Sequence, residues 1–225
     1  MRLNNLVLTF LESTIKVGDK KMLKVGITGG IGSGKSTITN MLREKCFPIV
    51  DADIVAREVF IIYPEVVSAI KEEFGCEFFD EKGELNRKEF GNYIFKSEIL
   101  RKKLENIMMP YIREEINHRI KICEDENLKF CFLDAPTLIE NNYHTSMDVT
   151  ILVWASKDVQ IKRVMARDNL SIDETMDRIR AQMPMDEKKK FANFIIDNDG
   201  NVENTKSQLD SIITQLERVN VKNDV

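Results

Sequence analysis

The chain has 225 residues, of which 43% are hydrophobic and 31% charged. Its 33 Lys and Arg against 37 Asp and Glu give a net charge of −4, so no sequence-wide basic field favours a polyphosphate backbone, and we expect no nucleic-acid partner. The length suffices for a self-standing core, which argues against disorder, collagen-like repetition and a disulfide scaffold. Nothing in the sequence indicates an obligate protein partner.

The cysteines, histidines and apolar runs bear on location. The four cysteines are widely spaced, mostly in apolar runs, and we interpret them as reduced core thiols: Cys46, Cys76, Cys123 and Cys131. The two histidines lack neighbouring ligands at metal spacing, so no structural zinc site is expected. The apolar stretch 6–11 is too short for a membrane span or a signal sequence. We therefore expect a cytoplasmic protein with no membrane association.

The elements expected in chain order begin after residue 21. Met22 is a candidate natural start, in which case 1–21 would be a non-native N-terminal extension. From residue 23, short apolar runs alternate with longer amphipathic ones, as in successive βαβ units. These runs predict an α/β fold with a five-stranded parallel sheet flanked by helices, the strands being 23–28, 47–50, 129–133, 149–153 and 193–196.

Two helical segments interrupt this rhythm. Residues 54–126 read as a helical insertion, with Pro110 marking a new helix start. Residues 157–191 read as a mobile lid, in which Ser171 and Glu174 fit a capping box for a helix through Met183. Within it, the run 188–190 of three lysines reads as a solvated face. The remaining segments, 22–53, 127–156 and 192–225, would form the core domain.

Residues 29–37, Gly-Gly-Ile-Gly-Ser-Gly-Lys-Ser-Thr, match the phosphate-loop pattern G-x-x-x-x-G-K-[ST] between a predicted strand and a predicted helix. The glycines let backbone amides converge on phosphate oxygens, and the helix start adds positive dipole character. Lys35 would bind the β and γ phosphates, and the Ser36 hydroxyl suits Mg²⁺. The motif predicts a P-loop NTPase fold that binds a nucleoside triphosphate through Gly30, Gly32, Ser33, Gly34, Lys35, Ser36 and Thr37.

An acidic pair, Asp51 and Asp53, follows the second predicted strand, and Arg57 comes one helical turn later. Because carboxyl ends of parallel strands border the ligand crevice, we expect both carboxylates to face the phosphate loop. Asp53 is our candidate for accepting the proton of an attacking hydroxyl, and Asp51 for a magnesium or positioning role. The alternative for Asp53 is an ordinary helix cap. No Asn-Lys-x-Asp segment typical of a GTPase is present.

Four later residues carry weaker signals. Asp134 ends the third strand in the manner of a Walker B acid, although a structural turn is a close alternative. Arg163 and Arg167 share one helix face and could neutralise charge during phosphoryl transfer; the alternative is ion pairing with neighbouring aspartates. Asn198 could contact an adenine edge or simply form a turn.

These motifs resemble the dephospho-CoA kinase family over residues 25–200. The likeness is strongest in residues 27–37 and in 51–57, Asp-Ala-Asp-Ile-Val-Ala-Arg, and weaker in 83–87, which contains Arg87. The resemblance implies a core, a helical CoA-side domain at 54–126 and a lid, with transfer of the ATP γ-phosphoryl to the ribose 3′-hydroxyl of dephospho-CoA. It also implies Asp53 as base, Gly32 through Thr37 as ATP-binding loop, Arg163 as lid arginine and Asn198 as nucleotide contact.

The resemblance further implies a magnesium-dependent enzyme whose acceptor contacts include Asp53, Arg57, Arg87 and Asp134. Two departures from the family pattern are Met109-Pro110 in place of His-Pro, and Pro136-Thr137-Leu138 in place of Pro-Leu-Leu. From the residues alone, a nucleoside or nucleotide kinase and a nucleotide-dependent switch remain alternatives. The acidic pair favours a kinase, because a switch needs no base aimed at an acceptor hydroxyl.

Overall fold

The computed structural model describes residues 22–221, with side chains through Arg218, and divides the chain into two compact units. The first unit contains the described residues up to Val50 and from Ile122 onward, and the second runs from Asp51 to Lys121. The prediction about residues 1–21 lies outside the described residues.

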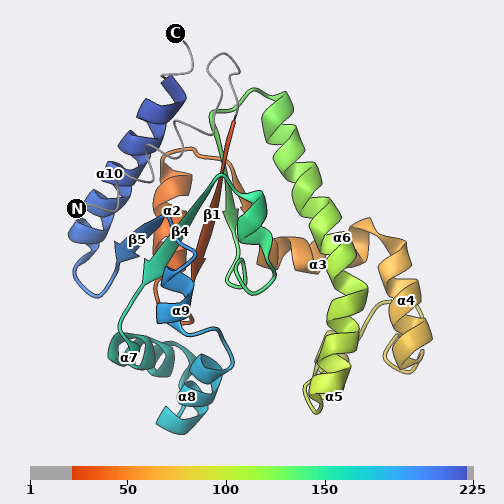
Figure 1. The fold of residues 1–225 in the computed structure, drawn as a ribbon. Coiled ribbons are helices and arrows are strands. Elements are labelled where there is room, and N and C mark those ends of the chain that lie inside the picture. Colours follow the sequence, from red (N-terminus) through yellow and green to blue (C-terminus); the bar gives the residue numbers. More distant parts are fainter. Residues whose placement is uncertain (1–21, 222–225) are drawn as a thin grey trace. The chain divides into compact units, whose positions relative to one another are not determined.

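The first unit is built on a five-stranded sheet in the order β2-β3-β1-β4-β5. β1 pairs in parallel with β3 and with β4, and β4 pairs in parallel with β5. The predicted parallel sheet is thereby confirmed, with these bounds: β1 Leu23–Gly29, β2 Ile49–Asp51, β3 Phe130–Asp134, β4 Val149–Trp154 and β5 Phe194–Asp197. β1 lies at the centre, so the segment that follows it starts in the middle of the sheet's carboxyl edge (Figure 1).

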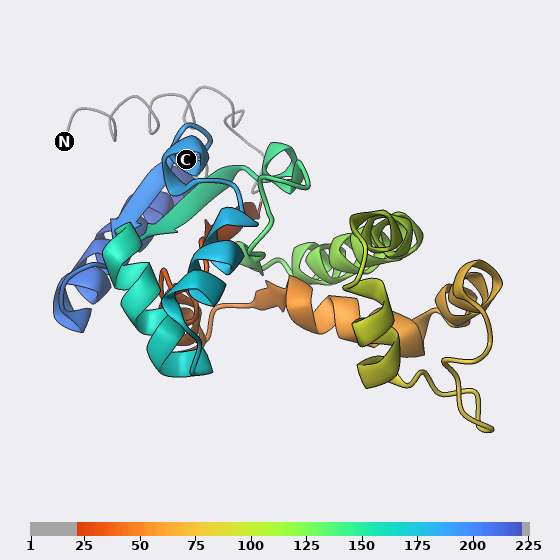
Figure 2. The same cartoon turned by 90° about the horizontal axis from the view of Figure 1, so that it is seen from below.

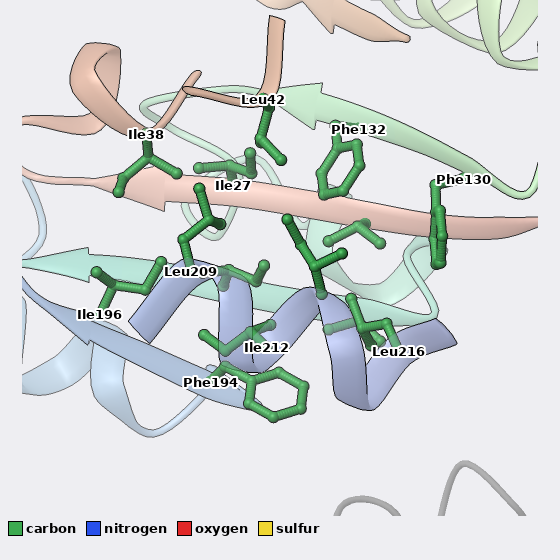
Figure 3. Packing of buried hydrophobic residues seen from close by; sticks show 14 of the residues in the cluster. Ile27, Ile38, Leu42, Phe130, Phe132, Phe194, Ile196, Leu209, Ile212 and Leu216 are labelled. Atoms are coloured by element: carbon green, nitrogen blue, oxygen red, sulfur yellow. The ribbon is translucent and has the colours of Figure 1, made fainter. Parts of the chain in front are cut away.

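Two helices, α2 (Lys35–Glu44) and α10 (Val202–Val221), cover one face of this sheet. Alternate residues of the strands point toward these helices, because side chains along a strand alternate between its faces. Figure 3 shows Ile38 and Leu42 of α2 and Leu209 of α10 packed over the strand residues in this core. The core fixes α2, and with it the start of the helix that follows β1.

The other face carries α9 (Met185–Lys189). Val153 packs in the core beneath α2 and α10, whereas the ring of its neighbour Trp154 lies 4.4 Å from the Lys189 ammonium. Since consecutive strand residues face opposite sides, α9 lies across the sheet from α10. α7 (Lys157–Asp168) and α8 (Ile172–Arg180) lie at the carboxyl end of the strands, at the bottom in Figure 1 and toward the viewer in Figure 2.

The capping box predicted for α8 is present: Ser171 accepts from the Glu174 amide, and the Glu174 carboxylate accepts from the Ser171 amide at 2.8 Å. The helix ends at Arg180, three residues before the expected Met183. The segment 181–184 instead leaves the helix and runs to the loop after β1.

The second unit is helical and has its own apolar core. It contains α3 (Ala52–Ile62), α4 (Pro64–Phe74), α5 (Arg87–Ile94) and most of α6 (Glu98–Asp125), with an isolated bridge between Phe79 and Leu85. The expected helix start at Pro110 is wrong, because α6 continues through it. A proline inside a helix costs about 3 kcal/mol. Apolar residues on both sides of it, including Leu104 and Tyr111, pack on the unit's core and hold the helix together.

The interpretation of the four cysteines as core thiols is correct for only two of them. Cys123 and Cys131 are buried, but Cys46 and Cys76 are exposed, and all four are free thiols. Cys46 follows the last turn of α2 with φ 60°, so it belongs to the turn that ends this helix and not to the core. No helix among residues 22–221 combines the length and apolar character needed to cross a membrane.

Candidate active site

The loop between β1 and α2 is a compact turn whose last glycine begins the helix. The Ser33 amide donates to the Gly30 carbonyl at 3.0 Å, and Gly34 takes the N-cap position of α2 with φ 88°. A side chain at Gly34 would collide with the amide nitrogen of Asn198 as well as strain the backbone. The loop therefore leads directly into the positive end of the α2 dipole, which favours an anion there.

Two side chains from distant segments bind the carbonyl side of this loop. The buried Asn198 side-chain amide donates to the Ser33 carbonyl at 2.7 Å and accepts from the Thr205 hydroxyl at 2.8 Å. The Arg163 guanidinium of α7 donates to the carbonyls of Gly32 at 3.4 Å and Ser33 at 3.3 Å. With its carbonyls turned toward these donors, the loop is held in one conformation. The adenine contact predicted for Asn198 stays a prediction.

The cation of the loop is paired with the acid that ends β3. The Lys35 ammonium donates to one carboxylate oxygen of Asp134, and the Thr39 hydroxyl of α2 donates to the other at 2.8 Å. Asp134 is buried, and a buried carboxylate is retained in a protein when charged or hydrogen-bonding partners surround it. Asp134 therefore positions Lys35 beside the loop. Asp134 does more than end β3 in a structural turn, which was the alternative interpretation from the sequence.

The two hydroxyl residues after Lys35 lie in the first turn of α2, where Ser36 is exposed and Thr37 half-buried. Mg²⁺ prefers hard oxygen ligands and usually keeps several waters. The Ser36 hydroxyl fits such a site, and its position beside Lys35 suits a cation that bridges phosphates. Among residues 22–221, no group of three or more His, Cys, Asp or Glu forms a cage for a metal ion.

Arg163 and Arg167 share a helix but have different partners. Arg163 binds the loop, whereas Arg167 is paired with its neighbour Asp168 through two hydrogen bonds of 2.7 and 2.9 Å. Arg178 of α8 binds the same carboxylate at 2.8 Å. The ion-pair alternative therefore describes Arg167 in this structure, and its nucleotide contact stays a prediction.

In the second unit, four candidate residues lie in or next to the first turns of α3 and α5. Asp51 is the N-cap of α3, accepting from the amides of Asp53 at 3.0 Å and Ile54 at 3.2 Å. The cap is thus Asp51, and the exposed Asp53 lies in the first turn. Arg57, one turn further, is exposed, and the Arg87 guanidinium donates to its carbonyl at 3.3 Å while lying over the Phe60 ring. The magnesium role of Asp51 stays a prediction.

One lysine expected in solvent is completely buried. Lys188 has no exposed surface, donates to the Pro136 carbonyl at 2.8 Å and forms an ion pair with Glu140 at 2.9 Å. The expectation of a solvated face at 188–190 is therefore wrong for this residue. A run of three lysines carries no signal that would distinguish its first member, and Glu140 lies 48 residues away in the chain, which is why sequence reasoning missed the pair.

The remaining members of that run behave differently. Lys189 lies over the Trp154 ring, and Lys190 is exposed and pairs with Glu187 at 2.7 Å. Of the residues where the sequence departs from the family pattern, Met109 lies half-buried within α6 and Thr137 is exposed after β3.

The parallel sheet, the loop that joins its central strand to α2, and a lysine held beside that loop define a P-loop kinase fold. Residues 23–204 match the family model described as dephospho-CoA kinase. The chain therefore belongs to the dephospho-CoA kinase family.

Individual relatives agree with this assignment. The chain is 46% identical over 214 residues to the dephospho-CoA kinase of Clostridium tetani, covering 94% of each chain. It is 48% identical over 192 residues to that of Clostridium perfringens, covering 85% of this chain and 96% of the relative. Among solved structures, dephospho-CoA kinase from Campylobacter jejuni is similar with a TM-score of 0.67 and 26% identity, covering 88% of this chain and 98% of that one.

Proposed function

We propose that the chain transfers the γ-phosphoryl group of ATP to the ribose 3′-hydroxyl of dephospho-CoA, giving coenzyme A and ADP. The observation that carries this proposal is membership of the dephospho-CoA kinase family over residues 23–204. The loop before α2, with Lys35 held against Asp134, agrees with it.

On the ATP side, the loop amides and the α2 N-terminus would receive the phosphates. Lys35 would contact the β and γ phosphates as a point charge, and Asp134 keeps its ammonium beside the loop. Arg163 lies against the loop and can neutralise charge that develops during transfer. Gly30, Gly32, Ser33, Gly34, Ser36, Thr37, Arg167 and Asn198 complete the proposed nucleotide site.

On the acceptor side, Asp53 would accept the proton of the attacking 3′-hydroxyl. Arg57 lies four residues further along α3, hence on the same face as Asp53, and the Arg87 guanidinium is bonded to its carbonyl. Two guanidiniums next to a carboxylate suit an acceptor that carries a diphosphate beside its ribose. In this proposal Arg57 and Arg87 bind the acceptor, and Asp53 orients its hydroxyl.

Phosphoryl transfer asks for alignment and charge stabilisation more than for covalent help. Mg²⁺, held by Ser36 with Asp51 as the second candidate, would neutralise charge on the β and γ phosphates when bound. The protein's own part is to hold the phosphates, orient the hydroxyl through Asp53 and place Arg163 beside the reacting group. We propose a cytoplasmic location, because the four free thiols fit a reducing compartment.

An acceptor screen tests the reaction. The purified chain with ATP and Mg²⁺ is offered dephospho-CoA, nucleosides and nucleotides separately, and products are identified by mass. We expect a gain of one phosphate on dephospho-CoA and no comparable product from the others. Equal phosphorylation of nucleosides would indicate the rival kinase, and ATP consumption independent of any acceptor would indicate a nucleotide-dependent switch.

A further inference from the structure

Two glutamine side chains hydrogen-bond to the backbone of one residue in the phosphate loop, one to its amide and the other to its carbonyl. The Ile31 amide donates to the Gln182 side-chain oxygen at 2.7 Å, and the Ile31 carbonyl accepts from the Gln160 side-chain nitrogen at 3.0 Å. Gln160 lies in α7, and Gln182 follows the end of α8. The segment that enters the lid and the segment that leaves it therefore both bind the same loop residue.

The neighbouring loop residue is held equally closely. The Gly30 amide donates to the Met185 sulfur at 3.2 Å. A Cβ atom on Gly30 would lie 2.5 Å from the Gln160 nitrogen and 2.8 Å from that sulfur, closer than packed atoms approach. Only a glycine lets Gln160 and Met185 close on the loop in this way. Gln160, although polar, is 3% exposed, which is the mark of a side chain buried for its hydrogen bonds.

The segment that carries Gln182 and Met185 is itself anchored to the sheet. Glu140, which follows β3, accepts from the Met183 amide at 3.4 Å and pairs with the buried Lys188 at 2.9 Å. Lys188 also donates to the Pro136 carbonyl at 2.8 Å. Because a buried ion pair resists displacement of either partner, the Gln182 oxygen is held at a fixed position relative to β3.

We propose that Gln160 and Gln182 are positioning residues that set the conformation of the phosphate loop for ATP. The loop's amides must converge on the phosphate oxygens, and a loop already held in that form binds without an ordering cost. Gln160 supplies the donor and Gln182 the acceptor that together fix the Ile31 peptide groups. This inference rests on the proposed function insofar as ATP is the ligand of the loop.

The opposite hydrogen-bonding roles of the two glutamines allow a matched test. Replacing the amide by a carboxylate keeps the acceptor that Gln182 uses but removes the donor that Gln160 uses. Gln160→Glu and Gln182→Glu each add one negative charge beside the same residue, but only Gln160→Glu replaces the donor to Ile31 by a group that cannot donate. Both glutamines line a cavity of about 400 Å³, and each substitution conserves side-chain volume.

We expect Gln160→Glu to raise the KM for ATP by about tenfold more than Gln182→Glu does, since it loses the hydrogen bond to Ile31 and its carboxylate repels the Ile31 carbonyl. The KM for dephospho-CoA should change less than twofold in both variants. ATP binding measured by calorimetry without acceptor should follow the same order. Gln215→Glu on α10, whose amide bonds to Ser211, is the control for an added charge elsewhere and should leave all three quantities unchanged.

A neutral pair guards against misfolding of a charged variant. Gln160→Met and Gln182→Met remove either hydrogen bond without adding charge, and each should raise the KM for ATP by about fivefold with little change in Tm. Equal ATP effects of the two glutamate variants, or wild-type ATP constants in both methionine variants, would overturn the inference. So would losses spread equally over both substrates. If the wild-type chain binds ATP but does not phosphorylate dephospho-CoA, the proposed function fails and the calorimetric comparison still decides this inference.

Discussion

The Arg163 guanidinium donates a hydrogen bond to the backbone carbonyl of Asn198, 2.8 Å away. Its other terminal nitrogen reaches the Gly32 and Ser33 carbonyls, and the Asn198 side-chain amide donates to the same Ser33 carbonyl. Helix α7, the end of β5 and the phosphate loop are thus joined through two side chains. A guanidinium can serve three carbonyls at once because its five N–H donors lie in a fixed plane.

We expect Arg163→Ala to lower kcat by about 100-fold, the loss typical of removing a charge-stabilising donor. Arg163→Lys should recover only part of the rate, since one ammonium cannot reproduce the planar set of contacts. The measurement is steady-state kinetics with circular dichroism melting as control. Full activity in Arg163→Ala would leave the residue with a structural role only.

Substitution by asparagine should distinguish the roles of Asp51 and Asp53. Asp53→Asn should lower kcat by about 100-fold with little change in ATP binding, as expected for loss of a general base. Asp51→Asn should keep the α3 cap, because asparagine caps as well as aspartate, whereas Asp51→Ala should lose about 1 kcal/mol of stability. Normal turnover in Asp53→Asn would remove that residue from its proposed role.

Substitutions of Lys188 and Lys190 allow the effect of a buried ion pair on the free energy of unfolding to be compared with that of an exposed one. Lys188→Met should lower the free energy of unfolding by about 3 kcal/mol, because it leaves the Glu140 carboxylate without its buried cation. Lys190→Met removes an exposed pair with Glu187 and should cost under about 0.5 kcal/mol. Urea unfolding curves supply both values, and similar losses at the two sites would contradict the burial argument.

The α7–α8 connection should weaken in acid. The hydrogen bonds from Arg167 hold the pKa of Asp168 below its usual value, with Arg178 adding a further favourable charge. A carboxylate with a lowered pKa stabilises the fold above its unfolded-state pKa of about 3.9, and this contribution is lost as the pH falls through the lower folded-state pKa. Protection factors for hydrogen exchange in α8, which correct for the slower intrinsic exchange of amides in acid, should therefore fall below about pH 4 in the wild type. The same acid-dependent loss of protection should be absent in Asp168→Asn. If the loss remains in this variant, another titrating group causes it.

Sequence patterns correctly predicted the structural features that are set by residues close together in the chain. The glycine and lysine spacing of residues 29–37 located the phosphate loop, and alternating apolar runs located the strands, because both signals repeat within a few residues. The capping box at Ser171 was equally local. The continuous helix through Pro110 was missed, since the apolar contacts that outweigh the proline belong to other helices.

By itself the sequence determined the fold class, the position of the phosphate loop and the set of candidate groups around it, since each is read from a short pattern of neighbouring residues. Only the tertiary structure decided which partner each polar side chain takes. Lys35 with Asp134, Lys188 with Glu140, and Gln160 and Gln182 with Ile31 are pairings between segments far apart in the chain. Such contacts form because burial leaves a polar group no water to bind, so it must take the partner that the packing of distant elements brings within reach.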